Sequence, residues 1–510
     1  MTVAHNGHPD DLNAADDPSY LTRRDAVKLT AGAIAGVALV ECQREPVSSS
    51  STRALVDPLY NSSAMAIAAA IRAGEVSANE VTNAFLSRIE EVNSQLNAVV
   101  QLRADEARSE ARRADDAIRS GDPLGPLHGV PMTIKDSLDT AGMVSTGGLV
   151  GRAAFVPARD ATAVQRLRQA GAILLGKTNT PELTLAYETD NGVYGRTSNP
   201  WDLDRTTGGS SGGAGAILAA GGSAFDIGSD YGGSIRIPAH FNGIAGLKPT
   251  HGRVSRAGDI LPYGGTHDSF QQIGPMARYV EDLAPLLRII AGPDNVDPAV
   301  VPMPLADPDE VDLSALRVAF YTNDGISDPT GETQTVVATA ANALAGTGAS
   351  VEEGRPPGLE RAFGIGLRFY IGAATTVRAN RIREAAGQAT PGIASGNPLE
   401  PSALDQLFED WYTVRHEMTS FFNEHDVILC PVSSSAAPRH GNTAVRDFSY
   451  SIAYNVTGWP AGVVRAGTSA EGLPIGVQIV AAPSREDRVL AVARFLEQEL
   501  GGFAPPTGLS

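Results

Sequence analysis

A glycine-rich stretch, residues 208–238, contains two groups of serines that could perform nucleophilic chemistry. Ser210 and Ser211 lie between glycine pairs, and Ser234 follows another pair. Glycine has no Cβ, so it accepts positive φ angles and lets the backbone come close to a ligand. The segment Asp230–Ser234 can therefore turn sharply and direct several successive N–H groups to one point, beside a serine hydroxyl. That is the arrangement of an oxyanion hole next to a nucleophile.

The residues between the two serine groups support this interpretation. Small apolar residues from Ala214 to Ala220 predict a closely packed helix, whose N-terminus would add a positive dipole at the same point. A flexible Gly/Ser linker is the alternative for such a composition. The apolar letters AILAA inside the stretch, and IRIPAHFNGIAGLKP after it, argue against a linker.

A lysine that could serve as a base ends an upstream apolar run. The run is Pro131–Asp136, with the letters PMTIKD, and it includes Lys135. Taken alone, such a lysine reads as a side chain that reaches water from a strand edge. Buried among apolar and hydroxyl groups, its charged form is disfavoured and its pKa falls. Because only the neutral amine accepts a proton, this chemistry requires a desolvated lysine.

Together, GGSSGG, D-x-GGS-I-R-x-P and I-K-D resemble the sequence pattern of the amidase signature family, which uses a Ser–cis-Ser–Lys triad. The resemblance implies Lys135 as the base, Ser210 as the relay serine on a cis peptide, and Ser234 as the nucleophile. It places the oxyanion hole at the N–H groups of Tyr231, Gly232, Gly233 and Ser234. It also implies supporting roles for Ser211, Asp230 and Arg236.

The family resemblance further implies an α/β fold, in which helices flank a large mixed β-sheet as an α/β/α arrangement. The expected reaction is hydrolysis of a small-molecule carboxamide to a carboxylate and ammonia or an amine, without metal or cofactor. The catalytic domain would span residues 57–505. A variable region, 355–445, contains two predicted helical stretches, 362–386 and 403–423, whose aromatic residues would shape an apolar or aryl pocket. The oligomeric state is open, with a homodimer as one option.

Two other functions remain open at this point. The segment Gly208–Gly212 also fits the nucleophile elbow G-x-S-x-G of an α/β-hydrolase-type esterase. That fold needs a downstream acid and histidine, and none of the nine histidines has a spacing that singles it out. The second alternative is a glutamine-hydrolysing amidotransferase subunit, which would use the same triad and deliver ammonia to a partner protein.

The segment Gly171–Thr178 matches the phosphate-loop pattern G-x-x-x-x-G-K-[ST]. Its middle residues, Ala-Ile-Leu-Leu, favour a strand, whereas a phosphate loop has to turn there. Pro181 then prevents a helix from following directly. We therefore predict a structural strand at this segment and no ATP site.

The amino-acid composition argues against two classes of binding partner, nucleic acids and metal clusters. The 510 residues carry 40 basic and 58 acidic side chains, a net charge of −18, which repels nucleic-acid phosphates. The two cysteines, Cys42 and Cys430, are too few for a cysteine metal cluster. Cys430 lies in the apolar run VILCP and reads as a buried thiol.

Residues 1–42 resemble a twin-arginine export signal. Arg23-Arg24 and Lys28 precede an apolar stretch of about a dozen residues, 29–40. This stretch is too short for a membrane span, which needs about 20 apolar residues. Position 26 is alanine where such signals usually carry phenylalanine. We expect a periplasmic or extracellular enzyme, or a cytoplasmic one if the signal is not functional, and a linker over residues 43–56.

Overall fold

The computed structural model describes residues 53–265, 268–370, 373–390, 400–507 and 509. The predicted export signal, residues 1–42, and most of the predicted linker, 43–56, lie outside the described residues. At the start of the described chain, the Arg53 guanidinium donates to the Glu497 carboxylate at 2.8 Å. None of the described helices is both long enough and apolar enough to cross a membrane.

Eleven strands form one mixed sheet in the order β1-β3-β2-β6-β8-β7-β12-β13-β11-β9-β10. Neighbouring pairs at the β3-β2-β6 and β11-β9-β10 positions are parallel, and the others are antiparallel. The strands are β1 (Val99–Leu102), β2 (Pro131–Lys135), β3 (Ile173–Thr178), β6 (Phe225–Asp230), β7 (Ala245–Lys248), β8 (Gln272–Ala277), β9 (Arg317–Phe320), β10 (Ser350–Glu353), β11 (Val427–Pro431), β12 (Ala461–Thr468) and β13 (Pro474–Ala481). A separate hairpin pairs β4 (Ser198–Asn199) with β5 (Asp202–Thr206).

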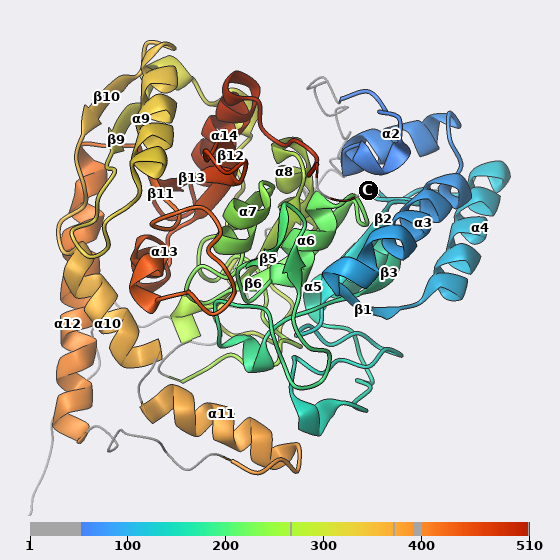
Figure 1. Cartoon of the computed structure of the whole chain (residues 1–510), viewed down its shortest axis with the longest axis horizontal. Helices are drawn as coiled ribbons and strands as arrows, with labels where there is room; N and C mark the ends of the chain where they lie inside the picture. Colours follow the sequence, from blue (N-terminus) through green and yellow to red (C-terminus); the bar gives the residue numbers. More distant parts are fainter. Residues whose placement is uncertain (1–52, 266–267, 371–372, 391–399, 508, 510) are drawn as a thin grey trace, which may run out of the picture. The chain divides into compact units, whose positions relative to one another are not determined.

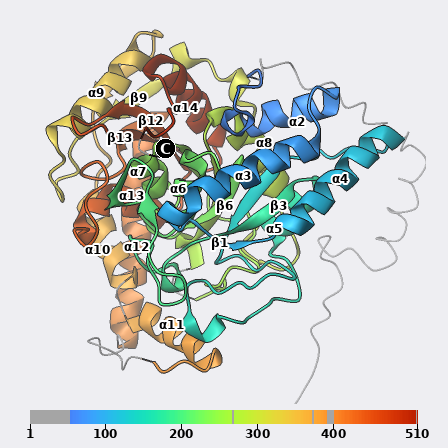
Figure 2. The same cartoon turned by 45° about the vertical axis from the view of Figure 1, so that its right-hand side comes forward.

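Helices surround this sheet, and α3 and α4 lie side by side in both views (Figure 1, Figure 2). The helices are α2 (Ala64–Ala73), α3 (Ala78–Leu96), α4 (Ala104–Ser120), α5 (Thr162–Gln169), α6 (Gly212–Ala219), α7 (Arg236–Asn242), α8 (Leu283–Ile290), α9 (Gly331–Ala345), α10 (Leu359–Tyr370), α11 (Ala373–Ala385), α12 (Pro401–Ser420), α13 (Ser449–Val456) and α14 (Glu486–Leu500).

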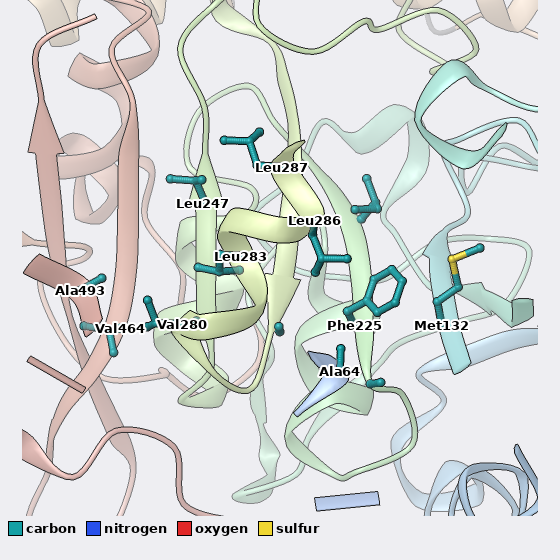
Figure 3. Close-up of a cluster of buried hydrophobic side chains, with 14 of the residues drawn as sticks. Ala64, Met132, Phe225, Leu247, Val280, Leu283, Leu286, Leu287, Val464 and Ala493 are labelled. Carbon is teal, nitrogen blue, oxygen red and sulfur yellow. The ribbon is translucent and has the colours of Figure 1, made fainter. Parts of the chain in front are cut away.

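Successive side chains of the inner strands enter two different apolar clusters. In β13, Ile479 belongs to the cluster that contains Val489 of α14, whereas Val480 belongs to the cluster that contains Ile237 of α7. Successive strand residues point to opposite faces of a sheet, so α14 and α7 cover opposite faces. Figure 3 shows part of the first cluster, with Leu283 of α8 among its members.

Two local expectations can be compared with these elements. The phosphate-loop-like segment contains β3, a fully buried strand, so the prediction of a structural strand is confirmed. The expected helical stretch 362–386 falls on α10 and α11, and residues 371–372 between them lie outside the described residues.

Candidate active site

Lys135 is the last residue of β2 and lies in the middle of the sheet region formed by β3, β2 and β6. Its side chain is completely buried. The ammonium nitrogen Nζ lies 2.7 Å from Ser210 Oγ, 2.9 Å from Ser211 Oγ and 3.0 Å from Ser229 Oγ. Burial lowers the pKa of Lys135 to about 7, although nearby carboxylates act in the opposite direction. A neutral amine is therefore accessible at this position near neutral pH.

The first serine pair lies in the turn before α6. The peptide bond between Gly209 and Ser210 is cis, as the family resemblance implied. A side chain at Gly209 would come within 2.6 Å of the Ala186 carbonyl oxygen, so the close approach of this segment requires glycine. The turn directs both serine hydroxyls toward Lys135.

Ser234 lies in the turn between β6 and α7. Its hydroxyl is buried and has no hydrogen-bond partner within the described part of the chain. The two serine groups are linked through the backbone, because the Ser211 N–H donates to the Ser234 carbonyl at 3.2 Å. A direct Ser210–Ser234 hydroxyl bond is not formed in this arrangement. Catalytic hydrogen bonds are often loose without substrate and tighten in the reactive complex.

Asp230 and Arg236 hold this turn in place. Asp230 accepts from the N–H groups of Gly233 and Ile235 at 2.9 and 3.1 Å. It also forms a two-point ion pair with the Arg236 guanidinium, at 3.0 and 2.9 Å. Burial alone would raise the pKa of Asp230, but Arg236 holds it well below its ordinary value. Asp230 therefore remains ionised and fixes the turn.

Arg236 is in turn fixed by residues far away in the sequence. It donates to Gln478 Oε1 at 2.6 Å, to Asn455 Oδ1 at 2.5 Å and to the Ser451 carbonyl at 2.9 Å. These partners come from α13 and β13. The motif did not reveal them, because they lie more than 200 residues downstream and carry no local signal.

The residues predicted to form the oxyanion hole differ in the hydrogen bonds that their backbone groups already make. The Gly233 N–H donates to Asp230, so this donor is engaged within the turn. The Gly232 carbonyl accepts from the Tyr187 hydroxyl at 3.2 Å. A Cβ at Gly232 would come within 2.9 Å of that hydroxyl, and one at Gly233, where φ is 120°, would overlap Ile237. Both glycines are therefore required for the shape of the turn.

Aromatic rings line the same turn. The Tyr231 ring stacks on Tyr370 of α10 with 4.9 Å between ring centroids, and Tyr187 stacks on Phe448 at 4.0 Å. Tyr370 comes from the region predicted to shape the pocket. Phe369, Phe408 and Trp411 of that region pack against one another instead, and Tyr412 is largely exposed.

Three buried carboxyl groups act on Lys135 from β6 and from the loop that contains Asp259. Asp226 accepts from Thr133 Oγ1 at 2.6 Å and from Thr178 Oγ1 at 3.0 Å, and burial raises its pKa to about 7. Burial also raises the pKa of Asp259 to about 6. Asp226, Asp259 and Ser229 were not predicted as site residues. Ser229 could have been noticed only from its place one residue before Asp230 in the motif.

The geometry does not favour the esterase alternative. His240 is buried in α7, where its Nδ1 accepts from the Gly476 N–H at 2.7 Å and its Nε2 lies 3.0 Å from the Ser435 carbonyl. Burial lowers the pKa of His240 to about 4. Across the described ranges, no histidine is hydrogen-bonded to Ser210, and no three His, Cys, Asp or Glu side chains are placed to hold a metal ion.

A family model described as Amidase matches residues 80–490. The chain belongs to the amidase family. It is 36% identical over 492 residues to fatty-acid amide hydrolase 2-B of Danio rerio, covering 89% of this chain and 92% of that protein. It is 35% identical over 476 residues to a glutamyl-tRNA(Gln) amidotransferase subunit of Synechococcus sp. (strain CC9605), covering 85% of this chain and 95% of that protein.

A solved structure, 6-aminohexanoate cyclic dimer hydrolase complexed with substrate, is similar with a TM-score of 0.79 and 30% identity. The match covers 89% of this chain and all of that one (100%). The expected α/β fold, a large mixed sheet flanked by helices, is thereby confirmed. This amidase-family chain is a hydrolase that acts on amide C–N bonds.

Proposed function

We propose that this chain hydrolyses a small carboxamide through an acyl-enzyme on Ser234. Neutral Lys135 accepts the proton of Ser210, and Ser210 accepts the proton of Ser234, whose Oγ attacks the carbonyl carbon. The C–N bond then breaks, the relay returns a proton to the leaving amine, and water releases the carboxylate. The observation that carries the proposal is the 2.7 Å contact between the buried Lys135 Nζ and Ser210 Oγ.

Backbone donors in the Ser234 turn would stabilise the oxyanion that forms in each step. Tyr231, Gly232 and Ser234 supply the proposed donors, since the Gly233 N–H is directed at Asp230. One such preorganised donor contributes about 3 kcal/mol to transition-state stabilisation. Asp230 and Arg236 act as positioning residues because they fix the turn without a role in bond making.

The preferred substrate carries an apolar or aryl group. The rings of Tyr187 and Tyr231 both stack on Tyr370 next to Gly232, at the turn that holds the nucleophile, and give the site an aromatic wall. Aromatic faces add about 1 kcal/mol per well-placed ring pair beyond the burial of area. This composition supports anilides and other planar amides above small polar ones.

The experiment is acyl release from aryl and alkyl amides by the wild type and by Ser234→Ala and Ser210→Ala. We expect both variants to lose at least about a hundredfold in kcat/KM while the unfolding temperature is retained. Ser314→Ala is the matched control, because this exposed hydroxyl only contacts Asp312. Wild-type turnover by Ser234→Ala would overturn the nucleophile assignment.

A second candidate function is release of ammonia from glutamine for a partner protein. The 35% identity to a glutamyl-tRNA(Gln) amidotransferase subunit favours it. Glutaminase activity that requires a co-purifying protein would support this candidate. Turnover of anilides by the isolated chain, with no glutaminase activity either alone or together with co-purifying proteins, would exclude it.

We also propose that residues 1–42 direct export and that the enzyme is a homodimer. The paired Arg23-Arg24 ahead of a short apolar stretch supports export. Replacing both arginines by lysine would then retain the protein in the cytoplasmic fraction. A mass in light scattering equal to that of one chain, 53.1 kDa for the full sequence and less once the signal is removed, would contradict the dimer.

A further inference from the structure

A narrow cleft lies beside the turn that carries Ser234, and its lining has an unusual composition. Leu185, Leu261 and Pro262 give it apolar walls. Tyr231, three residues before Ser234, forms part of the same lining, so the cleft touches the turn at this one residue. Arg378 of α11 also lines it. An arginine in such a cleft is an obvious recognition group for an anion.

Arg378 has no carboxylate partner among the described residues. Its guanidinium donates to two backbone carbonyls, that of Tyr263 at 3.2 Å and that of Gly264. A guanidinium has five N–H donors, so these bonds leave donors for a ligand. By contrast, Arg383 on the same helix is paired with Glu182 at 2.7 Å. The charge of Arg378 is thus the one on this helix that faces the cleft without a paired acid.

Asp268, the acidic residue that lines the same cleft, already has its own partners. Asp268 lies 3.0 Å from the Arg256 guanidinium and also accepts from the Gly264 N–H. Gln271, another lining residue, donates its amide to Asp259. Arg378 is therefore the charged side chain in the cleft that is left to meet a substrate.

Apolar contacts also fix helix α11 against the loop that contains Tyr263 and Gly264, whose carbonyls accept from Arg378. Ala379 of α11 packs in a small cluster with Leu149, Leu183, Ile260 and Leu261. This packing fixes α11 against the loops around the cleft, so the position of the Arg378 guanidinium is set by the fold. A preorganised guanidinium binds a carboxylate through two parallel N–H···O bonds.

We propose that Arg378 selects amides that carry a carboxylate group at the end of an apolar or aryl segment. The cleft encloses about 20 Å³, little more than the room of a water molecule, so only the carboxylate would enter it to meet the guanidinium. The apolar or aryl segment would lie outside it, and the amide carbonyl at the Ser234 turn. This inference rests on the proposed function and names a substrate class for the same site.

The test compares matched substrates that differ only in the charge. One pair is glutaryl 4-nitroanilide and pentanoyl 4-nitroanilide, and the other is N-acetyl-4-aminobenzoate and N-acetyl-4-methylaniline. We expect wild type to prefer the anionic member of at least one pair by about tenfold in kcat/KM. Arg378→Gln should remove this preference by raising KM for the anion, with kcat for the neutral member unchanged. Arg383→Gln is the control on the same helix and should keep the preference.

Two results would overturn the proposal. One is the absence of an anionic preference in both pairs, and the other is an equal loss on both members in Arg378→Gln, which indicates only a structural hold on the loop. Calorimetric binding of glutaryl 4-nitroanilide to Ser234→Ala, with and without Arg378→Gln, needs no turnover. At least tenfold weaker binding with Arg378→Gln would support the anion site even if Ser234 proved not to be the nucleophile. Equal binding would overturn it.

Discussion

Lys135 and Lys177 lie on adjacent parallel strands, β2 and β3, and both side chains are completely buried. The strand register pairs Lys135 with Thr178 and Lys177 with Ile134. Because successive strand residues point to opposite faces, the two lysines leave the sheet on opposite sides. Burial lowers the pKa of Lys177 to about 8 and that of Lys135 to about 7. The two lysines therefore differ little in burial or in pKa.

Their hydrogen-bond partners separate them clearly. The three shortest contacts of Lys135 are serine hydroxyls, which can donate a proton as well as accept a hydrogen bond. Lys177 donates to the Leu138 carbonyl, to Thr140 Oγ1 at 2.8 Å and to Ser145 Oγ at 3.2 Å, so it too has hydroxyl partners. These partners all lie in the loop after β2, so Lys177 ties that loop to the sheet, whereas the hydroxyls beside Lys135 include both members of the first serine pair. The comparison teaches that the segment that supplies the hydroxyls, more than burial or pKa, distinguishes the proposed base from a structural lysine.

The largest expected effect belongs to Lys135→Met. Loss of the base should lower kcat/KM on a nitroanilide by about a thousandfold, because no other amine contacts Ser210 within the described residues. Methionine fills a similar volume, so the thermal unfolding midpoint is the check that the fold is retained. Activity within tenfold of wild type would contradict the assignment of Lys135 as the base.

The matched substitution Lys177→Met should act on stability. It leaves the Leu138 carbonyl and the Thr140 hydroxyl without their buried donor and removes the positive charge near Asp136. We expect the free energy of unfolding in urea to fall by about 3 kcal/mol, with kcat per folded molecule changed less than threefold. A folded Lys177→Met enzyme as inactive as Lys135→Met would show that both lysines serve catalysis.

Removing one hydroxyl beside each lysine compares the two sites with smaller changes. Ser211→Ala removes one of the contacts to Lys135, and we expect about a tenfold loss of kcat from the poorer orientation of the base. Thr140→Val should instead lower the free energy of unfolding by about 1 kcal/mol and leave kcat unchanged. Reversed outcomes, with kcat falling in Thr140→Val, would contradict the assignment.

The smallest effect concerns pH. Lys135 acts as a base only when neutral, so kcat/KM should rise with pH and reach half its maximum near pH 7. The carboxyl groups of Asp259, Asp230 and Asp226 all raise the pKa of Lys135. Removing one charge with Asp226→Asn should therefore move this midpoint to lower pH, by less than about one unit because Asp226 itself titrates near 7. A shift to higher pH would contradict this electrostatic account.

Much of the site was predictable because its parts are local in sequence. The motifs place Lys135, Ser210 and Ser234 at the end of β2, before α6 and before α7, where short turns bring them together. The strand at Ile173–Thr178 followed from its apolar letters. These features depend on glycines and apolar runs that act over a few residues, so they are visible without tertiary information.

Other parts depend on contacts between distant segments and could not be predicted. Asn455 and Gln478 reach Arg236 only because α13 and β13 pack against α7. Tyr370 of α10 stacks on Tyr231, which lies about 140 residues earlier in the chain. The spacing of side chains within one segment carries no information about contacts with a distant segment.

The central claim is that Ser234 is the acylated residue. The most direct measurement is peptide mass mapping after reaction of the intact enzyme with phenylmethanesulfonyl fluoride, which forms a stable adduct with an activated serine. The account predicts one adduct, on the peptide fragment that contains Ser234, and none in Lys135→Met, where the base is missing. An adduct on Ser210, or a Ser234 adduct that forms as fast in Lys135→Met, would contradict it.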